Sequence, residues 1–211
     1  MRVVYLSDTE LGKEMYDFLK KCDCEVVFAD LENTRFSNIR LPEYDLGISF
    51  LYSWKVPESE LQSPYRWVNF HPAPLPEYGG RNLAYHAIMD GAAEFGATVH
   101  YMDKGFDTGE IIRVERFKIN PRDTAGDLVA WSRYFLRLMF IAWIPNILLG
   151  KIPSTPQNGT TRYFKREPIS DLVELTDGQQ RLVRALTVHP TYHAKATVGG
   201  RTYKIIPEDK L

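Results

Sequence analysis

Cysteine is scarce in this chain, and a long uninterrupted apolar run is missing. The 211 residues contain two cysteines, Cys22 and Cys24, which are one residue apart and too close for an ordinary disulfide. Few cysteines without a disulfide framework are typical of a reducing compartment, and no second cluster follows that would complete a metal site with them. The most apolar stretch, residues 135–149, is interrupted by Arg137 and Pro145 and is too short to span a bilayer.

A strong net charge, a targeting signal and a dinucleotide motif are also missing. The net charge is −1 at pH 7 and the pI is about 6.5, whereas a nucleic-acid-binding surface is normally strongly basic. Residues 1–6 read as a strand rather than as the apolar centre of a secretory signal. We therefore expect a cytoplasmic protein that binds neither a membrane nor a nucleic acid. Gly12 belongs to no Gly-x-Gly-x-x-Gly sequence, so a dinucleotide cofactor is not expected.

Strands and helices alternate along the first half of the chain. Apolar runs and helical spacing predict strands at residues 2–7, 25–29, 45–51 and 67–70, and helices at residues 10–21 and 57–61. This alternation predicts an α/β fold, a Rossmann-like open and mostly parallel sheet with helices on both faces. Ligands of such sheets bind outside the carboxyl ends of the strands.

The second half adds two more strands, a long helix and a small extension. A helix from Asn82, as its N-cap, to residue 89 is followed by strands at 97–101 and 110–119, which bracket a turn-rich loop. Thr124 is expected to cap a long helix toward Gly150. Its apolar positions, taken as core or subunit contact, are Trp131, Phe135, Leu138, Met139 and Ile141.

Pro, Gly, Ser and Thr are frequent in residues 151–161, which read as a linker or irregular loop. A short strand at 163–164, a helix at 179–186 and a hairpin across Gly199-Gly200 follow. We expect one Rossmann-like domain over residues 1–150 and a small α+β extension over residues 151–211.

The most informative motif is Asn69-Phe70-His71, at the end of a predicted strand, with Asp107 in a loop 36 residues after His71. Asn69 and His71 alternate along the strand, so both side chains face the same side. An amide N–H and an imidazole that converge on one oxygen stabilise an oxyanion. The Asp107 carboxylate can accept the proton of an attacking amine, directly or through water. The trio therefore suits acyl transfer to an amine without a covalent enzyme intermediate.

Each of these residues also has a plain structural interpretation. A histidine beside a proline is usually structural, and Asp-Thr-Gly is a common turn; the order and spacing of the three residues favour the catalytic interpretation. A metal site is the other alternative, because His71, His100 and Asp107 could form a His/His/carboxylate set. A histidine satisfied by hydrogen bonds is the more usual outcome, so no metal is expected.

The pattern Asn-x-His-x-x-x-Leu-Pro with a later Asp-x-Gly, preceded by Thr98-Val99-His100, resembles the 10-formyltetrahydrofolate-dependent formyltransferases. In that family the Asn, His and Asp are catalytic, which implies this role for Asn69, His71 and Asp107. The likeness is greatest to the nucleotide-sugar N-formyltransferases. It covers nearly the whole chain and is carried by residues 85–88, 96–103, 105–112, 163–167 and the Gly-Gly hairpin.

The resemblance implies that N10-formyltetrahydrofolate is the co-substrate. Two loops are then expected to form the pterin slot, largely through backbone groups: Tyr52, Trp54 and Val56 in one, and Asp103, Gly105 and Phe106 in the other. The short residues 151–211 leave no room for the separate C-terminal barrel of methionyl-tRNA formyltransferases. That departure, with the near-neutral net charge, disfavours a tRNA substrate.

The resemblance also implies a nucleotide-linked amino-dideoxysugar as acceptor, and hence a role in polysaccharide or O-antigen biosynthesis. Arg81 and Asn82 are candidates for contacting the sugar or its phosphates, although a helix cap and a solvated arginine explain them equally well. Lys165 and Arg166 follow two aromatic residues and can pair with phosphates. The extension is expected to form part of the acceptor site or of a homodimer contact. Open alternatives are formylation of a glycinamide ribonucleotide or an aminoacyl group, and an inactive formyltransferase-like module.

Overall fold

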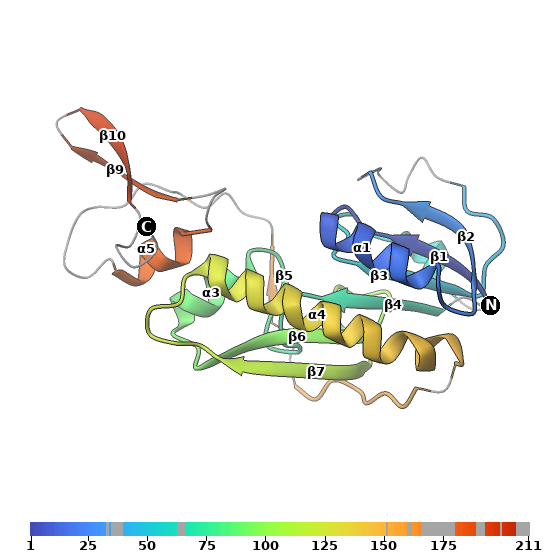
Figure 1. Ribbon diagram of the computed structural model, residues 1–211. Helices are drawn as coiled ribbons and strands as arrows, with labels where there is room; N and C mark the ends of the chain where they lie inside the picture. The colour runs from blue at the N-terminus through green and yellow to red at the C-terminus, as the bar shows by residue number, and fades with distance from the viewer. Residues whose placement is uncertain are drawn as a thin grey trace.

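The structure is a computed structural model that describes residues 1–32, 34, 40–62, 66–150, 152–159, 162–165, 180–188, 193–198 and 200–205. Its centre is a six-stranded sheet in the order β2-β1-β3-β4-β6-β7, shown in Figure 1. These strands are β1 (Arg2–Leu6), β2 (Glu25–Asp30), β3 (Leu46–Phe50), β4 (Arg66–His71), β6 (Glu94–Tyr101) and β7 (Ile111–Lys118). The helices are α1 (Glu10–Leu19), α2 (Glu58–Leu61), α3 (Leu83–Asp90), α4 (Ala125–Leu148) and α5 (Gln180–Leu186).

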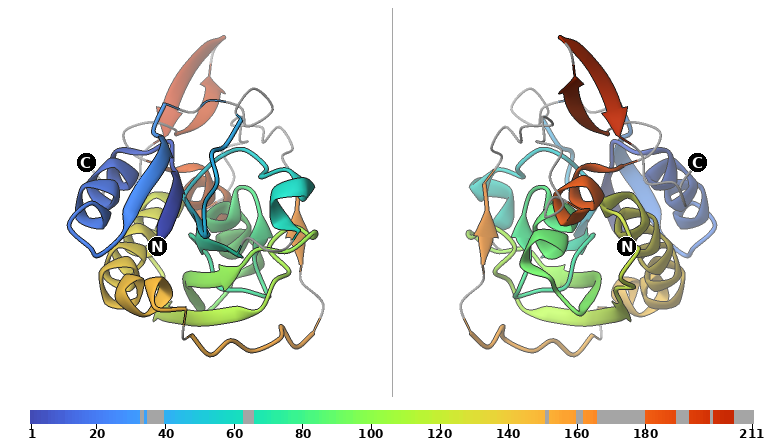
Figure 2. Two further views of the ribbon diagram at one scale, coloured as in Figure 1. Left: turned by 90° about the vertical axis from the view of Figure 1, so that its right-hand side faces the viewer. Right: turned by 90° about the vertical axis from the view of Figure 1, so that its left-hand side faces the viewer.

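The first four of these strands pair in parallel, whereas β6 and β7 run antiparallel to their neighbours. Side chains of each strand alternate between two layers. Tyr5 of β1 packs in the layer that contains α1 and α4, and Leu6 packs in the opposite layer with Leu61 of α2. Figure 2 shows α1 and α4 on one side of the sheet and α2 on the other. The predicted open α/β sheet with helices on both faces is therefore confirmed.

Helix starts differ in how well the sequence predicts them. Thr124 caps α4 as predicted: its hydroxyl accepts from the Asp127 N–H, and the Asp127 carboxylate accepts from the Thr124 N–H. Asn82 occupies the N-cap position of α3, but the expected side-chain cap is wrong because no such hydrogen bond forms. Capping needs an extended backbone at this position, whereas Asn82 has a φ of 56°.

The extension contains the predicted strand, helix and hairpin. These elements are β8 (Tyr163–Phe164), α5, β9 (Ala194–Val198) and β10 (Arg201–Ile205), with Gly199 outside the described residues. Ala185 of α5 belongs to the same buried apolar cluster as Ala84 and Ala87 of α3. The β9-β10 hairpin projects away from the sheet in Figure 1.

Residues 152–159 are irregular, as predicted, but they are packed on the sheet rather than forming a free linker. Thr155 forms an antiparallel bridge with Ile111 of β7. Beyond them, β8 pairs in parallel with the two-residue strand β5 (Gly79–Gly80). The start of the extension is thus attached to the loop that follows His71. Whether residue 150 also separates two domains remains a prediction.

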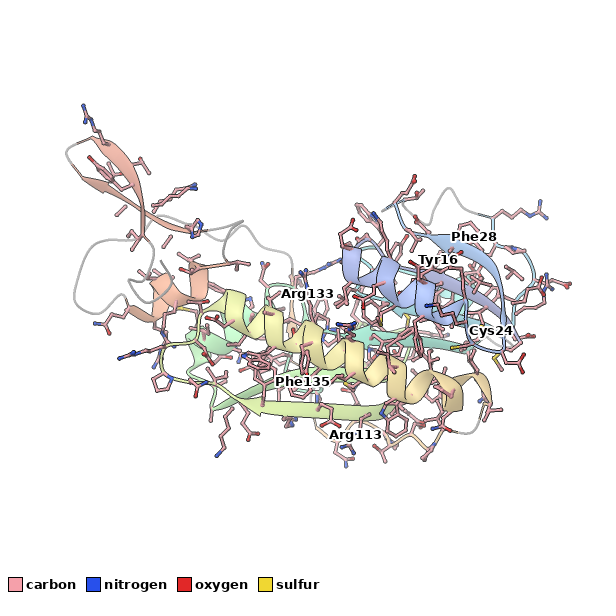
Figure 3. The ribbon with its side chains drawn as sticks, in the orientation of Figure 1. Tyr16, Cys24, Phe28, Arg113, Arg133 and Phe135 are labelled. Carbon is pink, nitrogen blue, oxygen red and sulfur yellow. The ribbon has the colours of Figure 1, made fainter. Side chains whose placement is uncertain are left out.

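The two cysteines are free thiols. Cys24 lies immediately before β2 (Figure 3). Burial raises the pKa of both thiols, which disfavours the reactive thiolate. None of the described helices is long and apolar enough to cross a membrane.

Candidate active site

A cavity of about 210 Å³ opens at the carboxyl ends of β3 and β4. Its wall includes the three residues predicted to be catalytic, Asn69, His71 and Asp107. The same wall includes all six residues predicted for the pterin slot: Tyr52, Trp54, Val56, Asp103, Gly105 and Phe106. The structure therefore brings together residues that are far apart in the sequence, and their roles remain predictions.

Asn69 is oriented by a histidine on the neighbouring strand. In the antiparallel pairing of β4 with β6, Asn69 lies opposite His100. Nδ1 of His100 donates to the Tyr101 carbonyl at 2.7 Å, so in the neutral ring Nε2 is an acceptor. It therefore accepts from Nδ2 of Asn69 at 3.1 Å. The second hydrogen of that amide remains available to a substrate oxygen in the cavity.

His71 is buried, with 4% of its surface exposed, and one of its nitrogens is committed to the backbone. Nε2 lies 2.8 Å from the Tyr78 carbonyl oxygen, which only accepts, so Nε2 carries the proton. Nδ1 lies 3.6 Å from Oδ1 of Asp107. Nδ1 can therefore donate to a substrate oxygen only when the imidazole carries both protons.

The loop between His71 and β5 is held by Thr98 of β6. Its buried hydroxyl donates to the Ala73 carbonyl at 2.7 Å and accepts from the Leu75 N–H at 3.0 Å. These bonds give a shaped, proline-rich loop the polar partners that its backbone needs. The loop in turn supplies the Tyr78 carbonyl that orients His71.

Asp107 has a left-handed backbone, with a φ of 55°. Its Oδ2 accepts from the Gly80 N–H at 2.8 Å, and its Oδ1 faces His71 and, at 3.8 Å, Nε2 of His100. Burial raises the pKa of Asp107, but the two imidazoles, the Gly80 N–H and Arg81 together lower it below its ordinary value. The carboxylate is therefore ionised at neutral pH.

Gly80 connects the extension to this carboxylate. It has a φ of 100°, and a Cβ at this position would lie 2.1 Å from the Phe164 carbonyl oxygen of β8. A side chain would separate β5 from β8 and displace the N–H that Asp107 accepts. The glycine is thus required both for the strand pairing and for the site.

Four residues were predicted for the acceptor side. Arg81 lines the cavity and donates to the Ser53 carbonyl, whereas the cavity wall does not include Asn82, which is exposed at the start of α3. Lys165 is exposed and also outside the cavity wall, and Arg166 lies outside the described residues. Of the three that the structure describes, Arg81 is the one at the cavity.

From the sequence, His100 was considered only as a ligand in the alternative metal set, and Gly80 was given no role in this site. Thr98 and His100 alternate along β6, and the antiparallel register places them beside His71 and Asn69. The Thr-x-His alternation was therefore the available signal for His100. No local pattern indicates that Tyr163 reaches the cavity, since this depends on the pairing of β8 with β5.

His100 titrates unusually low. Burial lowers its pKa to about 4, against the opposing influence of Asp107. The ring is therefore neutral at pH 7, which keeps Nε2 an acceptor for Asn69. Across the described residues, no group of three or more His, Cys, Asp and Glu side chains has an arrangement that could hold a metal ion.

We predict that His100 makes folding acid-sensitive. Between pH 6.5 and about 4 the unfolded chain binds a proton at this residue and the folded protein does not, so stability falls as pH falls. The loss reaches about 3 kcal/mol near pH 4. Urea unfolding at several pH values should show this slope, and His100→Phe should reduce it. Equal slopes in the two proteins would contradict the neutral, buried ring.

The segment that carries this site is similar to known proteins. The sequence model of the formyl transferase family matches residues 37–135. The GDP-perosamine N-formyltransferase of Brucella melitensis is 32% identical over 168 residues, covering 76% of this chain and 64% of the relative. The chain spans only 40% of the length of the Listeria monocytogenes methionyl-tRNA formyltransferase, which it matches over 125 residues at 32% identity.

Two crystal structures share the fold. A 4-N formyltransferase from Francisella tularensis has a TM-score of 0.82 at 19% identity, covering 98% of this chain and 97% of that one. A formyltransferase from Anoxybacillus kamchatkensis, in complex with UDP-4,6-dideoxy-4-formamido-L-AltNAc and tetrahydrofolate, has a TM-score of 0.67 at 24% identity, covering 79% and 86%. The segment that matches the formyl transferase family model, residues 37–135, contains Asn69, His71 and Asp107.

Proposed function

We propose that the protein transfers the formyl group of N10-formyltetrahydrofolate to the amino group of a nucleotide-linked amino-dideoxysugar. One observation carries the proposal: an amide, an imidazole and an ionised carboxylate meet in one cavity, and all three belong to the segment that matches the formyl transferase family model. The likeness to a perosamine N-formyltransferase and to a structure with tetrahydrofolate and a nucleotide sugar supports this choice of substrates.

The chemistry is a direct transfer between two nitrogens. The acceptor amine attacks the formyl carbon, a new C–N bond forms, and the carbonyl oxygen becomes an oxyanion. The second Nδ2 hydrogen of Asn69 and the Nδ1–H of protonated His71 donate to that oxygen, in a geometry where such donors are worth roughly 3–4 kcal/mol each.

Proton transfers complete the reaction. As positive charge develops on the attacking amine, Asp107 accepts its proton, directly or through water. The bond from the formyl carbon to N10 breaks, and N10 leaves with its electron pair and takes a proton from His71. Because Nδ1 of His71 lies 3.6 Å from Oδ1 of Asp107, the proton on Asp107 can return to His71 and restore the starting state.

The cavity suits both substrates. Tyr52, Trp54 and Phe106 offer flat apolar surfaces, and such surfaces stack on rings like that of a pterin. Phe106 and Tyr163 are exposed, so Phe106 lies between the inner cavity and its mouth. Its ring centre is 5.2 Å from that of Tyr163 and 4.6 Å from Nζ of Lys55. We assign the pterin to the inner cavity and the nucleotide to the mouth beside Arg81, with Lys165 and Arg166 as further candidates for the phosphates.

A second candidate is formylation of an aminoacyl group. The sequence match to a methionyl-tRNA formyltransferase favours it, whereas the net charge of −1 does not. A glycinamide ribonucleotide acceptor, an inactive module, a cytoplasmic location and a homodimer also remain predictions. The complete trio disfavours an inactive module.

Thermal unfolding with ligands tests the choice of substrates. Binding to the folded state at 100 times Kd adds about 2.7 kcal/mol to the free energy of unfolding. We expect 5-formyltetrahydrofolate, a stable analogue of the donor, and a nucleotide-linked aminosugar each to raise Tm. The same sugar nucleotide with a hydroxyl in place of the amine is the matched control for amine recognition. A shift with glycinamide ribonucleotide or an aminoacyl-tRNA, and none with any nucleotide aminosugar, would contradict the assignment.

A further inference from the structure

Gln157 contacts the loop that carries Asp107. Its Nε2 donates to the backbone oxygen of Asp107 at 2.8 Å and to that of Gly109 at 2.8 Å. A primary amide nitrogen has two hydrogens, so one side chain satisfies two carbonyls of the same turn. The contact reaches across 50 residues of sequence, from a segment outside the region that the family model matches.

The turn needs such an external contact. Asp107 is not a glycine, yet it has a φ of 55°, a conformation that costs roughly 1–2 kcal/mol for an L-residue with a side chain. On its other side the turn is held by Asp103, whose carboxylate accepts from the Gly105 N–H and the Thr108 hydroxyl, and these bonds are exposed to solvent. Gln157 acts on the Asp107 backbone itself.

The backbone conformation at Asp107 decides where its carboxylate points. In this conformation Oδ2 meets the Gly80 N–H and Oδ1 faces His71. A relaxed turn would swing the carboxylate away from both partners. Displacements of about 1 Å at reacting groups can lower rates about 100-fold.

We propose that Gln157 is a positioning residue for formyl transfer, holding the turn at Asp107 and Gly109 so that the carboxylate faces Nδ1 of His71. The inference rests on the proposed function, because that function gives Asp107 its role. Gln157 is not among the described residues that line the cavity. Its effect therefore passes through Asp107 and not through a substrate.

Residues 152–159 have other contacts with the sheet, which allow a positioning role of Gln157 to be distinguished from a contribution to folding. Thr155 bridges Ile111 of β7, and the Ser154 hydroxyl donates to Glu110 at 2.5 Å. The segment therefore stays attached to the sheet when the Gln157 amide is lost. Ser154→Ala is a matched control because it removes one side-chain hydrogen bond of the same segment.

The test compares Gln157→Ala and Gln157→Glu with Ser154→Ala. Glutamate keeps the shape but turns a carboxylate oxygen toward two carbonyl oxygens. We expect kcat to fall about 10- to 100-fold in both Gln157 variants, with KM for both substrates within about threefold and with Tm and circular dichroism near wild type. The acid limb of the pH–kcat profile should move to higher pH, because Asp107 loses the partners that lower its pKa. Ser154→Ala should keep the wild-type kcat.

A double variant supplies the sharper readout. In an Asp107→Asn background, Gln157→Ala should lower kcat no further, because the group that it positions is already absent. The positioning role would be overturned if the kcat losses of the two single variants multiplied in the double variant. It would also be overturned if the Gln157 variants changed KM alone, or if Gln157→Glu kept the wild-type kcat. If Asp107→Asn itself turned over at the wild-type rate, the proposed role of Asp107 would fail and the role of Gln157 with it. If Asp107→Asn is slow but Gln157→Glu keeps the wild-type kcat, the role of Gln157 is overturned and the role of Asp107 stands.

Discussion

Replacing His71 with alanine should lower kcat by about two to three orders of magnitude, because a donor to the developing oxyanion is removed. The charged Nδ1–H is the group that matters, since Nε2 is already engaged with the Tyr78 carbonyl. His71→Gln can donate to that carbonyl but cannot carry the charge, so it should be nearly as slow as His71→Ala. Steady-state kinetics with saturating donor and acceptor provide the measurement.

Asn69 provides a companion test of the same idea. Asn69→Ala should lose a similar factor in kcat, whereas Asn120→Ala, in an exposed loop, should keep the wild-type rate. Asn69→Ala should fold because Asn69 is a partly exposed residue of the cavity wall, and Asn120→Ala should fold because it shortens an exposed side chain. Wild-type rates in both His71→Ala and Asn69→Ala would exclude oxyanion stabilisation by this pair.

Asp107→Asn should lower kcat by about two to four orders of magnitude with little change in substrate affinity. Asparagine preserves the shape of the side chain and can still accept from the Gly80 N–H, but it neither takes the amine proton nor stabilises charge on His71. Asp17→Asn, on the exposed surface of α1, is the matched control for loss of one negative charge. A variant with weakened binding and an unchanged rate at saturation would assign Asp107 a structural role instead.

The pH dependence follows from the same residue. The lowered pKa of Asp107 keeps its carboxylate ionised at neutral pH. Activity should therefore be lost on the acid side only when the pH falls through this lowered pKa and the carboxylate becomes protonated. Asp107→Asn should remove this limb from its residual activity.

Strand periodicity allowed much of the site to be predicted from the sequence. Asn69 and His71 face one cavity because alternate residues of a strand share a side, and this follows from local spacing alone. Asp107 was predicted from its motif rather than from periodicity. The strand and helix positions of the first 150 residues also follow from local apolar patterns.

The missed features depend on pairing between distant segments. The Gly80 N–H reaches Asp107 in a geometry that β8 maintains, and Gln157 reaches the same turn across 50 residues. The antiparallel pairing of β6 with β4 and with β7 likewise joins segments whose partners no local pattern specifies. Local patterns do not encode which segments pair, so these contacts were beyond sequence interpretation.

The long helix shows a related limit. Met139, one of its predicted apolar positions, is buried, but Trp131, Leu138 and Ile141 are 49%, 44% and 38% exposed. The helix is apolar around most of its circumference, so periodicity does not distinguish the face that meets the sheet. The alternative of a subunit contact at these residues stays a prediction.

Transfer of a labelled formyl group is the most direct test of the proposed activity. The purified protein would be incubated with N10-formyltetrahydrofolate carrying a ¹³C-formyl group and a nucleotide-linked amino-dideoxysugar, and the sugar nucleotide would be analysed by mass spectrometry. We predict that the sugar nucleotide gains one labelled formyl group on its amine, and that His71→Ala and Asp107→Asn greatly slow this gain. An unlabelled sugar nucleotide across a panel of amino positions, with label found instead on glycinamide ribonucleotide or an aminoacyl-tRNA, would contradict the account.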